Sequence, residues 1–201
     1  MTNNQNISNN GLFLILDNLR SLLNVGAIFR TADAVGVKKI YLCGITAYPT
    51  NKLIKRIDNV DIDPIIGDKE GNAIIIYKPS KKCTTEFLHQ EIAKTALSAL
   101  DAVEWEYSTN TLEVISRLKK ESVNIISLEQ TDRSIDYCEA NYSAPLAIVI
   151  GHERLGVSKN VLDLSDQIVE IPMMGVGKSL NVSTAAGIIL YKAIEKSELN
   201  N

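Results

Sequence analysis

The sequence predicts an α/β protein with a mostly parallel β-sheet. Apolar runs of strand length alternate with stretches of helical periodicity, and residues 146–150 (LAIVI) form a continuous apolar run of the kind found in buried strands. The first strand, helix and strand together occupy about thirty residues, the size of a right-handed βαβ unit. At 201 residues, the chain suits one domain, or one domain with an insertion.

The first βαβ unit lies close to the N-terminus. Residues 12–16 are an apolar run of strand length, and residues 24–35 have helical spacing that ends at Gly36, a residue type common just after a helix. Residues 39–43 predict the second strand. The alternation then breaks between about residues 53 and 90, where we expect an insertion.

Within this insertion, residues 58–70 are acidic and interrupted by proline and glycine, and residues 73–77 are strand-like. Helical periodicity resumes near Glu86 and continues toward Leu100. Beyond it, three apolar runs predict strands and a long amphipathic stretch predicts the last helix, at residues 123–128, 146–150, 167–171 and 182–196. We therefore expect a single domain over residues 11–196, with a disordered polar N-terminus at 1–10 and a frayed tail at 197–201.

Composition excludes several classes of protein. Hydrophobic residues make up 45% of the chain and charged residues 22%, which excludes collagen-like, coiled-coil and wholly disordered proteins. The longest apolar runs are about five residues, whereas a membrane-spanning helix needs about 20. The polar N-terminus does not resemble a secretory signal, so we expect a cytoplasmic protein. Three distant cysteines and two histidines predict neither a disulfide framework nor a metal site.

Charge is unevenly distributed along the chain. The net charge is −3, yet residues 18–56 contain seven basic residues and one acidic residue, a local net charge of +6. Such a run is often only a solvated face, but it is also the segment that would meet a polyanion. If it binds RNA, the contacts are expected from Arg20, Lys52, Lys55 and Arg56.

A glycine-rich loop at residues 175–179 (GVGKS) suggests a nucleotide-phosphate site but does not fit the known patterns. A P-loop would need glycine at the position of Pro172, and a dinucleotide-binding loop would need a third glycine where Leu180 stands. The simpler interpretation is a flexible loop whose glycines permit unusual backbone angles.

Three other segments are more specific when taken together. They are residues 24–30 (NVGAIFR), 151–156 (GHERLG) and 171–183 (IPMMGVGKSLNVS). In order and character they resemble the three motifs of the SpoU (TrmH) family of knotted methyltransferases, N-x-G-x-x-x-R, G-x-E-x-x-G and I-P-M…S-L-N-V-S. The resemblance extends from residue 12 to residue 196, apart from the insertion.

The resemblance implies an S-adenosylmethionine-dependent transfer of a methyl group to a ribose 2′-hydroxyl in structured RNA. It also implies a C-terminal trefoil knot and a homodimer, neither of which periodicity predicts. The resemblance assigns one set of residues to catalysis: Asn24, Arg30, Glu153, Ser179 and Asn181. A second set would contact the cofactor through backbone groups and apolar walls: Leu128, Gly151, Ile171 and Leu180.

More than one role is open for several of these residues. On a helix, Arg30 lies 240° around the axis from Asn24, so the two need not share a face unless Asn24 is the N-cap. A guanidinium with a pKa above about 12 is an awkward base, so either Arg30 takes the hydroxyl proton itself or it holds an RNA phosphate that does. Glu153 could instead be a loop carboxylate at a helix N-terminus, and Ser179 or Asn181 an N-cap.

The function predicted from the sequence is therefore RNA ribose 2′-O-methylation, with tRNA preferred over ribosomal RNA and without a metal. One alternative is a non-catalytic RNA-binding paralogue with the same fold, although the motif residues speak against it. A nucleotide-phosphate enzyme that uses the glycine-rich loop is the third hypothesis, and Pro172 argues against it.

Overall fold

The computed structural model describes residues 11–49 and 85–199. Within them, seven strands form one sheet in the order β3-β2-β1-β6-β4-β7-β5, and every strand pair is parallel. The predicted α/β fold with a mostly parallel sheet is thus confirmed for this part of the chain. The strands are β1 Leu12–Asp17, β2 Lys39–Cys43, β3 Trp105–Ser108, β4 Asn124–Leu128, β5 Ile135–Asp136, β6 Leu146–Ile150 and β7 Gln167–Glu170.

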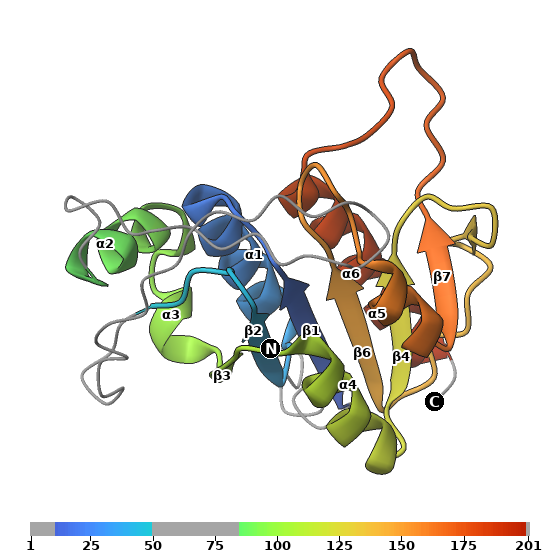
Figure 1. Ribbon diagram of the computed structural model, residues 1–201, viewed down its shortest axis with the longest axis horizontal. Coiled ribbons are helices and arrows are strands. Elements are labelled where there is room, and N and C mark those ends of the chain that lie inside the picture. Colours follow the sequence, from blue (N-terminus) through green and yellow to red (C-terminus); the bar gives the residue numbers. More distant parts are fainter. Residues whose placement is uncertain (1–10, 50–84, 200–201) are drawn as a thin grey trace.

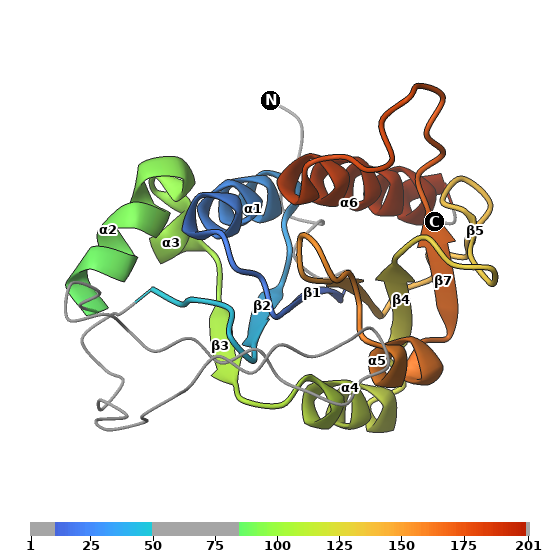
Figure 2. The same cartoon turned by 45° about the horizontal axis from the view of Figure 1, so that its top comes forward.

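Helices cover both faces of the sheet (Figures 1 and 2). On one face pack α1 (Leu22–Val35), α2 (Thr85–Ala96), α3 (Ala99–Ala102) and α6 (Val182–Leu199). On the other face pack α4 (Thr111–Lys120) and α5 (Lys159–Leu164). None of the helices in the described segments is long and apolar enough to span a membrane.

The central strand β1 shows why its sequence is apolar throughout. Its even-numbered residues Leu12, Leu14 and Leu16 pack with the α1 and α6 layer, whereas Phe13 and Ile15 pack with α4 and α5. Side chains alternate between the faces of a strand, so a strand covered on both sides is buried at every position. The continuous apolar runs in β1 and β6 follow from this placement.

The structure agrees with the sequence prediction at the C-terminal end of α1 but not at its N-terminal end. Gly36 follows the helix in the left-handed conformation, with φ of 71°, as predicted. The N-cap, however, is Ser21, whose side chain accepts a hydrogen bond from the backbone N–H of Asn24. The alternative in which Asn24 caps the helix is therefore wrong, and its side chain is available for another role.

The segment after the insertion also differs in detail. The helix expected from Glu86 to Leu100 is divided into α2 and α3, because Leu97 adopts a left-handed backbone conformation with φ of 55°. Residues 105–108 form the edge strand β3. The expected disordered N-terminus, the strand-like run at 73–77, most of the insertion and the cations Lys52, Lys55 and Arg56 lie outside the described residues.

Because all strand pairs are parallel, the carboxyl ends of β1, β4, β6 and β7 lie along the same edge of the sheet. The chain moves outward from β1 through β2 to β3, and the strands on the other side of β1 begin with β6. In open parallel sheets, ligands bind at the carboxyl ends of the strands beside such a change of direction. The first motif lies in α1, which follows β1, the second lies in the loop after β6, and the third extends from the loop after β7 into α6.

Candidate active site

A pocket of about 440 Å³ opens at this edge of the sheet. Its walls come from the loops after β4, β6 and β7 and from the start of α6. All four residues expected to contact a cofactor line it, namely Leu128, Gly151, Ile171 and Leu180. Its size falls within the range of small-molecule sites, roughly 300–1,000 Å³.

Two glycines in the loop after β6 are required by close backbone packing. A Cβ on Gly151 would lie 2.4 Å from the carbonyl carbon of Gly156 and from the backbone nitrogen of Val157. Gly156 has φ of 71°, and a Cβ there would lie 1.8 Å from Oε2 of Glu129. The spacing of the G-x-E-x-x-G motif therefore has a steric cause, since only glycine lets the loop fold back on itself.

Glu153 lies between these glycines and holds the start of α1. Its carboxylate accepts hydrogen bonds from the backbone N–H groups of Arg20 (3.0 Å) and Ser21 (2.9 Å) and from Nδ2 of Asn24 (3.1 Å). Burial alone would raise the pKa of Glu153, but these hydrogen bonds outweigh it and the pKa is lowered. Glu153 is therefore an anion at the N-terminus of α1, where the helix dipole favours negative charge.

A chain of hydrogen bonds continues from Glu153 to α6. A carboxylate only accepts hydrogen bonds, so Asn24 must turn its amide nitrogen to Glu153 and its Oδ1 away. That Oδ1 accepts from Nδ2 of Asn181 at 3.2 Å. Oδ1 of Asn181 in turn accepts from the backbone N–H groups of Ser183 (2.9 Å) and Thr184 (3.3 Å), at the start of α6. One polar chain thus joins the three motifs.

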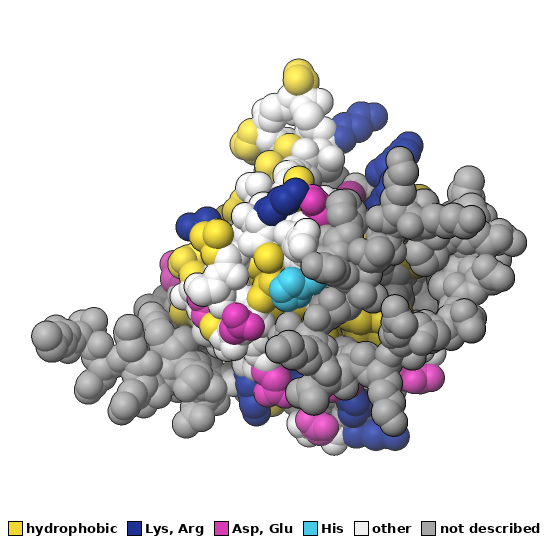
Figure 3. Space-filling model, turned by 90° about the vertical axis from the view of Figure 1, so that its left-hand side faces the viewer, with side chains coloured by type: hydrophobic (Ala, Val, Ile, Leu, Met, Phe, Trp, Pro, Cys, Tyr) yellow, Lys and Arg dark blue, Asp and Glu magenta, His cyan; other side chains and the backbone are white. Residues whose placement is uncertain are grey.

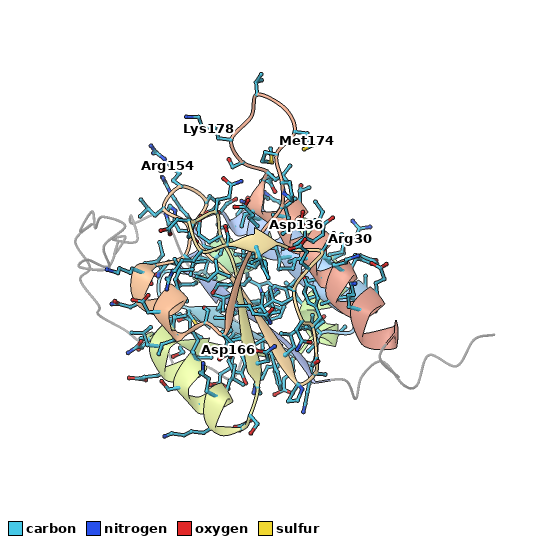
Figure 4. The ribbon with its side chains drawn as sticks, turned by 90° about the vertical axis from the view of Figure 1, so that its right-hand side faces the viewer. Arg30, Asp136, Arg154, Asp166, Met174 and Lys178 are labelled. Carbon is cyan, nitrogen blue, oxygen red and sulfur yellow. The ribbon has the colours of Figure 1, made fainter. Side chains whose placement is uncertain are left out.

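The two remaining predicted residues are placed differently. Ser179 lines the pocket, beside Leu180. Arg30 is exposed on α1 and forms no hydrogen bond or ion pair with another described residue. In Figure 4 it lies well away from the pocket-lining side chains Arg154 and Lys178. Within one chain, the structure therefore brings Asn24, Glu153, Ser179 and Asn181 together and leaves Arg30 apart.

Several residues that line the pocket were not singled out from the sequence: Glu129, His152, Arg154, Glu170 and Lys178. A usable signal existed for Glu129 and Glu170, because both stand at the ends of predicted strands. Nδ1 of His152 accepts from the backbone N–H groups of Arg154 (3.0 Å) and Leu155 (3.3 Å). Burial lowers the pKa of this imidazole, so His152 is neutral and its Nδ1 is engaged in the loop.

The lining suits a small cation with an aromatic portion. Leu128, Ile150, Ile171 and Leu180 provide apolar walls, and carboxylates stand at Glu129, Glu153 and Glu170. An adenine ring and a positively charged sulfonium match these two kinds of surface, so the residues present fit S-adenosylmethionine. Among the described side chains, no group of three or more histidines, cysteines and acidic residues is arranged to hold a metal ion.

Comparison with known proteins decides the family. The model of the SpoU rRNA Methylase family matches residues 71–191, which include the second and third motifs. The chain belongs to this family. It is also 27% identical over 170 residues to the tRNA (guanosine(18)-2′-O)-methyltransferase of Escherichia coli, a match that covers 85% of this chain and 57% of that enzyme. The chain thus spans little more than half of that relative's length.

Solved structures of family members have the same fold. The TrmH/SpoU tRNA modifying enzyme of A. aeolicus aligns with a TM-score of 0.67 and 26% identity, over 95% of this chain and 77% of that one. The SpoU methyltransferase AviRb from Streptomyces viridochromogenes, solved in complex with AdoMet, aligns with a TM-score of 0.70 and 20% identity, over 96% and 62%. The predicted α/β fold is therefore that of this family.

The lowered pKa of Glu153 predicts a pH-dependent contribution to stability. The carboxylate stabilises the fold above its unfolded-state pKa, and this contribution is lost as the pH falls through the lower folded-state pKa. We expect the difference in unfolding free energy between the parental chain and Glu153→Gln to be constant near neutral pH and to shrink below about pH 4.3. Urea unfolding at several pH values measures it.

Glu139→Gln is the matched control, because Glu139 is exposed and its side chain forms no hydrogen bond with the described residues. Its difference from the parental chain should stay level across the same pH range. A Glu153→Gln difference that also stayed level would show that the carboxylate does not hold the start of α1.

Proposed function

We propose that this chain transfers a methyl group from S-adenosylmethionine to a ribose 2′-hydroxyl of RNA, with tRNA preferred over ribosomal RNA. The observation that carries the proposal is the hydrogen-bond chain from Glu153 through Asn24 to Asn181 at the pocket. The family membership and the names of the matched relatives support the same activity. A cytoplasmic location is part of the proposal, since RNA is the substrate.

The reaction is a displacement at the methyl carbon. S-adenosylmethionine supplies a methyl group on a positively charged sulfur. When bound, it would offer this methyl carbon to the ribose O2′, so that the bond from sulfur to carbon would break as the bond from O2′ formed and the hydroxyl proton passed to a base. The residues of this chain contribute positioning, which is a large source of rate acceleration in bimolecular transfers.

Each residue has an assigned part in this proposal. Leu128, Ile171 and Leu180 hold the adenine, with backbone groups at Gly151, and Ser179 and Asn181 position the ribose. Arg30 either accepts the proton or holds an RNA phosphate that accepts it. Glu153 and Asn24 fix the relative positions of the loops.

A homodimer would explain why Arg30 lies apart from the pocket of its own chain. Because Arg30 does not join the cluster within its own chain, we propose that it serves the pocket of a second copy. The protruding loop between β7 and α6 supports such an interface (Figure 1), since Met174 and Val176 in this loop are fully exposed and Tyr191 on α6 is largely exposed. Exposed apolar groups of this kind are typical of protein interfaces.

The trefoil knot is proposed from the resemblance and from strand order. β4 and β5 are consecutive along the chain, yet β7 lies between them in the sheet. Residues 129–134 therefore pass across the end at which β7 leaves the sheet. A chain that emerges beneath this crossing and continues into α6 would be threaded, and threading is otherwise very rare.

Mixing two inactive variants tests whether Arg30 acts in trans. If Arg30 acts in trans, the defects of Arg30→Ala and Glu153→Gln fall in the same pocket of a mixed dimer, so the other pocket keeps both residues. We expect the co-refolded mixture to recover about a quarter of the parental rate, while either variant alone stays inactive. Light scattering should give twice the monomer mass of 22.1 kDa. Absence of recovery, with mixed dimers present, would place Arg30 in its own chain's pocket.

Nucleoside mass spectrometry tests the function itself. The protein is incubated with S-adenosylmethionine and either unmodified tRNA or unmodified ribosomal RNA, and the digests are searched for 2′-O-methylated nucleosides. We expect them in the tRNA sample. RNA binding without methylation of either substrate would favour the non-catalytic paralogue.

A further inference from the structure

Two basic side chains stand at the mouth of the pocket, on different motif loops. Arg154 belongs to the loop after β6 and Lys178 to the loop between β7 and α6, and both line the pocket while remaining exposed. Figure 4 shows them projecting on the same side of the molecule. Figure 3 shows basic side chains bordering the protruding loop at the top of that view.

Within the described part of the chain, neither of these two cations is paired with a carboxylate. Elsewhere in the described segments, six basic side chains form ion pairs with carboxylates, and these are Lys39, Lys94, Arg117, Lys119, Arg133 and Lys192. Unpaired cations at a pocket mouth are suited to bind a mobile anion.

The carboxylates of the pocket are, by contrast, held by donors of the protein. Glu129 accepts from the backbone N–H of Val157 at 2.7 Å, and Glu170 accepts from Oγ of Ser134 at 2.7 Å. Glu153 is held by the start of α1. The acidic groups are thus tied into the loops, and the cations are the groups left to meet an incoming polyanion.

We propose that Arg154 and Lys178 form a phosphate clamp that binds the RNA backbone beside the nucleotide entering the pocket. This clamp rests on the proposed function. With a net charge of −3, the chain cannot bind RNA through overall charge, so it needs a local cationic site. Arg154 offers a planar fork for two phosphate oxygens, and Lys178 offers a point charge on a longer, adaptable loop.

The salt dependence of RNA binding tests the clamp. The affinity of an unmodified tRNA transcript is measured at several salt concentrations for Arg154→Ala, Lys178→Ala and the double variant. Each lost phosphate contact should flatten the slope of log affinity against log salt by about 0.7 to 0.9, and the double variant by roughly twice that. Lys120→Ala, which removes an exposed cation on α4, is the control and should keep the parental slope.

S-adenosylmethionine binding is measured by calorimetry on the same proteins, and we expect parental affinity in the control Lys120→Ala, which lies away from the pocket. A parental salt slope in the double variant would overturn the clamp. Weakened cofactor binding with an unchanged slope would also overturn it, because the cations would then serve the cofactor carboxylate. Since binding is read without turnover, failure of methyl transfer in the parental protein would refute the proposed function separately.

Discussion

Arg30→Ala is expected to reduce methyl transfer to RNA by roughly 10²- to 10⁴-fold, the range for loss of a proton-transfer group or of a preorganised charge. Cofactor affinity should remain parental, because the proposal assigns Arg30 to the hydroxyl proton or to an RNA phosphate and not to the cofactor. Arg30→Lys should fail as well, since an ammonium does not reproduce the planar fork that binds a phosphate. Single-turnover methylation and calorimetry measure the two effects.

Asp33→Ala is the matched control for Arg30. Asp33 is exposed on the same helix, three residues further along, and its side chain forms no hydrogen bond with the described residues. That variant should methylate RNA at the parental rate. If Arg30→Ala did the same, the assignment of Arg30 to the chemistry would be wrong.

Gly151→Ala is expected to weaken the binding of S-adenosylmethionine at least tenfold. The added Cβ would lie 2.4 Å from backbone atoms of Gly156 and Val157, which cannot move away as a flexible side chain would. The loop after β6 must shift, and with it the pocket wall. Overpacking of this kind typically destabilises a fold by about 1–3 kcal/mol, so urea unfolding should show a lower midpoint.

Gly175→Ala controls for the loss of a glycine in a pocket-bordering loop. No atom lies within 4 Å of a Cβ at Gly175, so this variant should bind S-adenosylmethionine normally. Calorimetry measures the affinity of both variants for S-adenosylmethionine, at equal concentrations of folded protein. Parental affinity in Gly151→Ala would show that the pocket tolerates a displaced loop and does not depend on its backbone.

The strands that cross the core were predictable from the sequence, because burial on both faces requires an apolar side chain at every position. Residues 12–16, 39–43 and 146–150 all lie in strands of the buried sheet. The edge strand β3 was not predicted, since Trp105–Ser108 is short and only partly buried. A partly buried edge imposes no such pattern on its residues.

The residues of the polar chain, Asn24, Glu153 and Asn181, were also identifiable, because three motifs in order are specific even where each one is weak. The sequence did not predict that these residues come together at one site. Glu153 and Asn24 are 129 residues apart, and their hydrogen bond depends on β1 and β6 pairing as neighbours in the sheet. Local periodicity reports which residues share a face of an element, but not which elements pack together.

The sequence by itself therefore determined the buried central strands, the glycines of the second motif and the residues Asn24, Glu153 and Asn181, which form one polar chain. The tertiary structure alone decided that Ser21 rather than Asn24 caps α1, that Arg30 stands apart from its own pocket, and that Arg154 and Lys178 stand at its mouth. The physical reason is that an element's character follows from neighbours along the chain. The direction in which a polar side chain points follows from long-range packing, which brings its partner from another element.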